Sequence, residues 1–98
     1  MSLIHNPVSV FPLDARMAEF PGRIQQLSGH SPDLESLAVN LIKSIQSQDM
    51  EPSLRANTYQ TRLQARFVSK RFDPSLIPSI MSLAHDLKLF DNREPYHN

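Results

Sequence analysis

The sequence predicts an all-α protein: a small helical bundle of three main helices, preceded by one or two short helical segments. First, its 98 residues contain 2 glycines and 8 prolines, too few glycines for a fold built on tight β-turns. Second, apolar residues recur at helical spacing in several segments. Third, prolines stand where helices should begin, a position at which the missing N–H costs nothing. We therefore expect main helices at 32–48, 53–72 and 75–90, with more than about half of the residues helical, above the usual third.

A chain of this length forms one domain, which we place at residues 13–91. Residues 1–12 contain two prolines that oppose a helix, so we expect an extended or flexible arm there. The alternative is a short extended segment that adds to a sheet edge or packs in a groove. Residues 92–98 are expected to form a flexible tail. The sequence has no apolar run long enough to span a membrane and no secretory signal pattern, so we expect a cytoplasmic protein.

The first helical region carries an apolar stripe with the spacing 4, 3, 4, 3. Its members are Leu13, Met17, Phe20, Ile24 and Leu27. Pro21 and Gly22 interrupt the stripe, and inside a helix they cost about 3 and about 1 kcal/mol. We therefore expect two short helices, at 14–20 and 22–28, or one kinked helix. Asp14 is placed as an N-cap and Gly29 as a C-terminal cap.

The segment 32–48 has the clearest helical signature in the chain. Ser31 is a favoured N-cap, Pro32 suits the first helical position, and Asp33 complements the helix dipole. One face is apolar, and its residues are Leu34, Leu37, Ala38, Leu41, Ile42 and Ile45. The other face is polar, so an amphipathic helix is predicted.

The segment 53–72 predicts a helix with two apolar strips on opposite sides. One strip is Ala56, Tyr59, Leu63 and Phe67, and the other is Leu54, Ala65, Val68 and Phe72. A helix that is apolar on two sides needs two packing partners. We therefore expect this helix to be the central element of the fold.

The last helix, 75–90, begins after an Asp73 cap and Pro74. Because Pro78 also lies near its start, the regular helix is expected to begin as late as that residue. Its apolar stripe is Leu76, Ile80, Leu83, Leu87 and Phe90. The stripe either closes the bundle internally together with the stripe at 13–27 or remains available to a second chain.

The residues that usually carry chemistry are scarce. The absence of cysteine excludes disulfides, thiolate metal sites and thiol nucleophiles. The four histidines, His5, His30, His85 and His97, stand singly, without a second ligand at helical spacing. Glycine-rich phosphate loops and nucleophile elbows are also missing. We therefore expect no enzyme activity, no cofactor and no metal site.

Charge is unevenly distributed along a chain whose formal net charge is zero. Four basic residues project from one side of the predicted central helix: Arg55, Arg62, Arg66 and Lys70. We call them the basic stripe and expect their charged groups to reach water at the edge of the apolar strips. The stripe can serve an acidic partner or a phosphate backbone, or it can be a solvated edge that pairs with acids of neighbouring helices.

These features favour a small non-enzymatic adaptor, chaperone-like or regulatory protein that binds another protein through amphipathic helix faces. The candidate surfaces are the basic stripe and the apolar stripe at 76–90. A homodimer is one form that such an assembly can take. The alternative is a nucleic-acid-binding regulator that uses the basic stripe, although a neutral chain is unusual for that function.

Overall fold

The computed structural model describes residues 12–91, which contain four α-helices, one 3₁₀ turn and no strand. The elements are α1 (Leu13–Ser28), α2 (Pro32–Gln46), α3 (Pro52–Lys70), the 3₁₀ turn η2 (Pro74–Leu76) and α4 (Ile77–Asp86). Helical residues make up 79% of the described chain, which confirms the all-α prediction. The expectations for the arm before Pro12 and for the tail at 92–98 lie outside the described residues.

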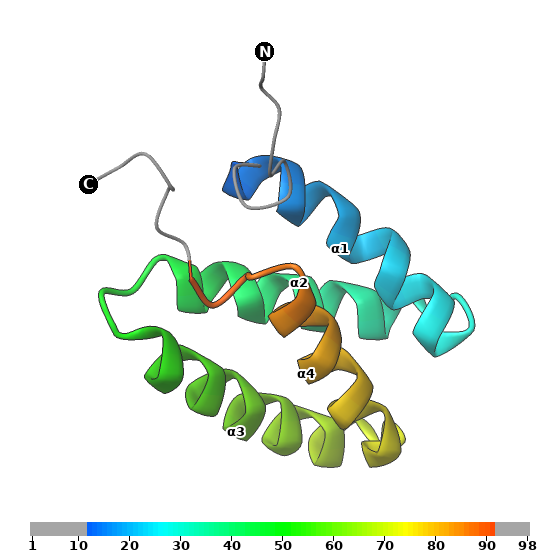
Figure 1. Cartoon of the computed structure of the whole chain (residues 1–98). Coiled ribbons are helices and arrows are strands. Elements are labelled where there is room, and N and C mark those ends of the chain that lie inside the picture. The colour runs from blue at the N-terminus through cyan, green and yellow to red at the C-terminus, as the bar shows by residue number, and fades with distance from the viewer. Residues whose placement is uncertain (1–11, 92–98) are drawn as a thin grey trace.

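The four helices pack around one core. Figure 1 shows α2 and α3 running beside each other in opposite directions, with α1 lying across α2. The short helix α4 packs against both α1 and α3, so each helix has two neighbours in the bundle.

α1 is one continuous helix of 16 residues, and it passes through Pro21 without ending. Of the two alternatives, a single helix is therefore observed rather than two short ones. The expectation of only three main helices is corrected, because α1 is longer than its neighbours α2 and α4. Phe20 and Ile24, on either side of the proline, are both 0% exposed, and their burial offsets the helix-breaking cost of Pro21. The predicted Asp14 cap is also wrong, because Pro12 occupies the N-cap and Asp14 lies in the first turn.

The predicted cap at the end of α1 and the predicted cap at the start of α2 are both confirmed. Gly29 ends α1 with a left-handed backbone, at φ 67°. The Ser31 hydroxyl accepts the N–H of Leu34 at 3.3 Å at the start of α2. α3 ends earlier than predicted, at Lys70, because Arg71 takes a left-handed conformation with φ 62°.

α4 is shorter than the predicted helix 75–90. The Asp73 carboxylate accepts the backbone N–H of Ser75 at 3.0 Å, and this bond, which favours the anion, lowers the pKa of Asp73. A 3₁₀ turn follows, and α4 ends at Asp86. The left-handed residue Lys88, at φ 56°, lets the N–H of Leu89 reach the carbonyl of Ala84 at 2.9 Å, so the chain leaves the helix axis.

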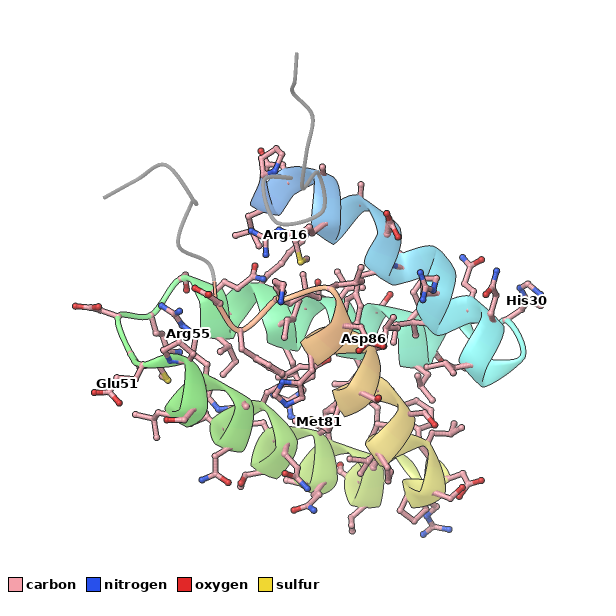
Figure 2. All side chains as sticks on the ribbon, viewed as in Figure 1. Arg16, His30, Glu51, Arg55, Met81 and Asp86 are labelled. Atoms are coloured by element: carbon pink, nitrogen blue, oxygen red, sulfur yellow. The ribbon has the colours of Figure 1, made fainter. Side chains whose placement is uncertain are left out.

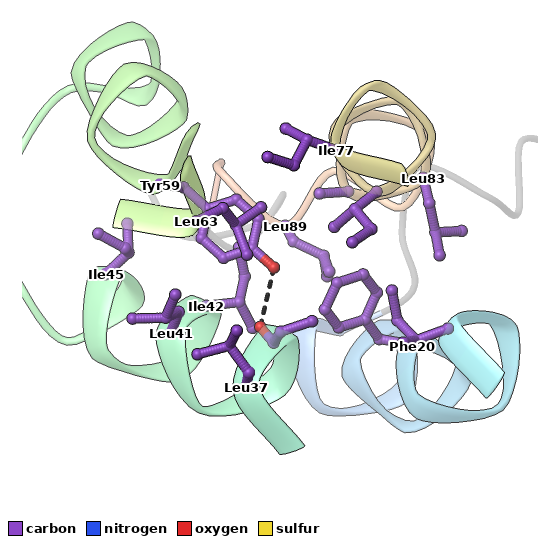
Figure 3. Packing of buried hydrophobic residues seen from close by; sticks show 14 of the residues in the cluster. Phe20, Leu37, Leu41, Ile42, Ile45, Tyr59, Leu63, Ile77, Leu83 and Leu89 are labelled. Carbon is purple, nitrogen blue, oxygen red and sulfur yellow. Dashed lines mark hydrogen bonds between the residues drawn. The ribbon is translucent and has the colours of Figure 1, made fainter. Parts of the chain in front are cut away.

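The core is closed by side chains from all four helices and from the segment after α4 (Figure 3). Within it the phenol of Tyr59, which is 0% exposed, donates to the carbonyl of Ala38 at 2.8 Å, the dashed bond in Figure 3. This bond joins α3 to α2. Because burial disfavours the phenolate, the pKa of Tyr59 is raised.

We expect Tyr59→Phe to lower the free energy of unfolding by about 1 kcal/mol at neutral pH, the usual contribution of one hydrogen bond. The protein should also lose stability above pH of about 10, because the unfolded phenol then ionises while the buried one stays protonated. Urea unfolding followed at several pH values measures both effects. A Tyr59→Phe variant that keeps the full alkaline loss would show that the loss comes from other groups.

Candidate functional site

The structure divides the basic stripe into two parts with different roles. Arg55 is 7% exposed, so the expectation that its charged group reaches water is wrong. Figure 2 shows the Arg55 side chain near the start of α3. Its guanidinium donates to one backbone carbonyl in the loop before α3 and to one in the segment after α4. The acceptors are Phe90 O and Gln48 O, each at 3.0 Å. Arg55 is therefore a structural residue.

Arg55 belongs to a set of three side chains that hold the segment 87–90, which we call the carbonyl clamp. Each comes from a different helix, and together they donate to four successive carbonyls. The bonds run from Arg16 Nη1 to Lys88 O (2.6 Å) and Leu87 O (3.4 Å), from Gln46 Nε2 to Leu89 O (3.0 Å), and from Arg55 Nη1 to Phe90 O (3.0 Å). The clamp satisfies carbonyls that the end of α4 leaves without helical partners.

The structural role of these arginines is not predicted above, although the sequence contains a signal for it. Arg16 precedes the buried Phe20 by four residues, and Arg55 precedes the buried Tyr59 by four. Both arginines therefore stand on the apolar face of their helices, in the first turns. A cation in that position must bury its stem and find acceptors inside the fold.

The apolar stripe at 76–90 packs into the core of the chain itself. Ile80, Leu83 and Phe90 are buried, and Leu76 and Leu87 are half-buried against them. Phe90 also contacts the ring of Tyr59, with the two centroids 5.6 Å apart. The stripe closes the bundle internally, which was one of the two alternatives, and it presents no broad exposed surface.

The remaining members of the basic stripe stay at the surface of α3. Arg66 and Lys70 are exposed and Arg62 is half-buried. Within residues 12–91, none of the three forms an ion pair with an acidic side chain. The pairing with neighbouring acids, expected if the stripe is only a solvated edge, is therefore not observed there.

Arg66 and Lys70 face a groove of about 430 Å³ between α2 and α3. The wall contributed by α2 consists of Asp33, Ser36, Leu37, Asn40, Leu41 and Ser44. Hydroxyl and amide groups thus lie opposite two cations, with one carboxylate at the start of α2. Such a lining offers hydrogen bonds and positive charge to an anionic group. It holds no histidine, and no nucleophile is paired with a base.

The second apolar strip of α3 is mostly unpartnered. Phe72 turns back to the core, where its ring meets that of Phe67 with centroids 5.4 Å apart. In contrast, Leu54 is 51% exposed, Val68 is 80% exposed and Ala65 is also exposed. α3 packs against α2 and α4, but apart from Phe72 its second strip has no partner among the described residues. The prediction that α3 is the central element of the fold is therefore wrong, because α3 has no more neighbouring helices than the others. We call Leu54, Ala65 and Val68 the outer strip.

Two other grooves border α4. One, of about 340 Å³, separates α1 from α4, and the other, of about 260 Å³, lies between the start of α3 and the clamped segment. His85 borders the second groove, and its ring meets that of Phe90 edge to face, with centroids 4.9 Å apart. In the part of the chain that the structure describes, no three His, Asp or Glu side chains are grouped to hold a metal ion.

Comparison with models of protein families, with curated proteins and with solved structures finds no match to this chain. The fold and its surfaces therefore provide the argument for function. None of the helices in residues 12–91 is both long and apolar enough to cross a membrane.

Proposed function

We propose that this protein is a non-enzymatic binding module, of the adaptor or regulatory kind, that binds an acidic segment of another protein in the α2–α3 groove. Arg66 and Lys70 supply the positive charge, and the hydroxyl and amide groups of α2 supply hydrogen bonds. The observation that carries the proposal is that these two exposed cations border a groove without an ion-pair partner among the described residues.

Charge distribution supports an acidic protein rather than a nucleic acid as the partner. Only two cations line the groove, and Asp33 lines it too. The chain as a whole is neutral. Nucleic-acid interfaces are much more positive than this, because each neutralised phosphate contributes to affinity. A short acidic peptide needs only a few cations.

The proposal is tested with a fluorescein-labelled glutamate-rich peptide, whose binding is followed by fluorescence anisotropy. We expect the peptide to bind the protein and the double variant Arg66→Glu/Lys70→Glu to weaken binding by about tenfold or more. Two attractive charge contacts become repulsive, and each is worth up to about 1 kcal/mol. Stability should hardly change, because both side chains are exposed.

Lys43→Glu is the matched control, because Lys43 is an exposed cation of α2 that does not line the groove. It should leave peptide binding nearly unchanged. Equal losses from the control and from the double variant would indicate general electrostatic attraction and contradict the groove. Tight binding to a labelled DNA or RNA duplex, falling steeply with salt, would instead favour the nucleic-acid function.

A further inference from the structure

We infer that the acidic partner segment is an amphipathic helix that lies along α3, with apolar residues on the outer strip and carboxylates on the exposed basic residues. The inference rests on the proposed function and extends its binding surface from the α2–α3 groove around α3. It depends on three features of the outer side of α3, which are the spacing of its residues, the position of its charges and the absence of acids.

The outer strip and the residues between its members have the spacing of a helix-pairing seam. The positions are Leu54, Thr58, Thr61, Ala65 and Val68, at intervals 4, 3, 4 and 3. This repeat keeps one face of a helix toward a second helix. The central residues are small, so a second helix can approach closely, and the apolar ends provide contact. From the first to the last position the seam is about 21 Å long by helical rise.

One edge of this seam is basic. At 100° per residue, Arg62 lies beside the seam, and Arg66 and Lys70 follow it toward the α2–α3 groove. The three cations repeat every four residues and therefore turn by about 40° around α3 at each step, away from the seam. A partner helix that crosses α3 obliquely toward the groove, with carboxylates repeating every three or four residues along one edge, would meet them in turn. The other edge carries Asn57 and Gln64, which are uncharged. The surface therefore selects a helix with one acidic edge.

A second copy of this chain does not supply such an edge from the same face. α3 contains no acidic residue between Pro52 and Lys70, so two α3 helices in contact would offer no carboxylate to either basic edge. Residues 1–11 contain apolar side chains but no carboxylate. The charge on this face is thus matched by an acidic helix of another protein.

The experiment uses two labelled peptides of the same composition, rich in Leu and Glu. In the first, leucines follow the 4, 3 spacing and glutamates occupy one edge, and in the second the order is scrambled. We expect the first peptide to bind more tightly and to gain helix on binding, measured by circular dichroism. Chemical-shift changes in an NMR titration should appear at the backbone amides of Leu54, Ala65 and Val68.

The double variant Leu54→Gln/Val68→Gln removes the apolar ends of the seam without changing charge. We expect it to weaken binding of the first peptide by about tenfold, because the peptide loses two apolar contacts. Leu27→Gln is the matched control, since Leu27 is an exposed leucine of α1, 36% accessible. This control should bind the peptide as the unchanged protein does.

The possible results separate the two proposals. If both peptides bind equally, lose affinity in Arg66→Glu/Lys70→Glu and are unaffected by the Gln variant, the groove stands and the helix on α3 is overturned. If neither peptide binds, the proposed function itself fails. If sedimentation shows a dimer that the Gln variant abolishes, a second copy covers the outer strip and the inference is wrong.

Discussion

Arg55→Met is expected to lower the free energy of unfolding by about 3 kcal/mol. Methionine keeps much of the stem but donates no hydrogen bond, so the carbonyls of Phe90 and Gln48 each lose a donor at 3.0 Å. A buried acceptor that loses its donor costs about 1–3 kcal/mol, and more when the donor is charged. The segment 87–90 should loosen first, which hydrogen exchange at Leu89 reports, and urea unfolding gives the total loss.

The matched control is Arg66→Met, the same substitution on the exposed side of the same helix. Because Arg66 has no ion pair among the described residues, it should change stability by less than about 0.5 kcal/mol. Arg55→Lys should fall between the two, since an ammonium keeps the charge but lacks the planar fork that reaches two carbonyls. Equal stability of Arg55→Met and Arg66→Met would show that the carbonyl clamp contributes little.

Phe20→Ala is expected to lower the free energy of unfolding by about 4 kcal/mol. The ring is 0% exposed in the core, and truncation of a buried phenylalanine costs about 3–5 kcal/mol. α1 should lose the most local stability, because Pro21 and Gly22 give it a low intrinsic helix propensity and it depends on packing against the core. Urea unfolding followed by circular dichroism measures the loss, and hydrogen exchange shows whether α1 opens separately.

A second substitution tests whether the burial of Phe20 offsets the cost of Pro21 inside α1. In the background of Phe20→Ala, Pro21→Ala should restore about 2 kcal/mol, because it returns a backbone N–H to the helix and removes the ring from the preceding turn. Leu27→Ala, at a 36% exposed position of the same helix, should cost less than about 1 kcal/mol and serves as the truncation control. Absence of rescue would mean that Pro21 causes no strain in α1.

The candidate site was only partly predictable from sequence. Helical spacing predicts that Arg55, Arg62, Arg66 and Lys70 lie on one side of a helix, but it does not distinguish the buried Arg55 from the other three. Tertiary packing gives these residues different environments. The first turn of α3, with Arg55, packs against the segment 87–90, whereas the last turns, with Arg66 and Lys70, are exposed beside α2. Helical spacing predicts the face on which a side chain lies, but it does not predict which turns of that face another segment covers.

Local sequence patterns are enough to predict the class of the fold, the limits of α2 and α3 to within about two residues, and the two apolar strips of α3. These follow from local spacing, capping and proline chemistry, which act within a few residues. Three features could not be predicted in this way: α1 continues through Pro21, α4 ends at Asp86, and the outer strip stays exposed. Each of these features depends on burial or hydrogen bonds between segments far apart in the chain. The local spacing of residues does not specify which distant segments come into contact.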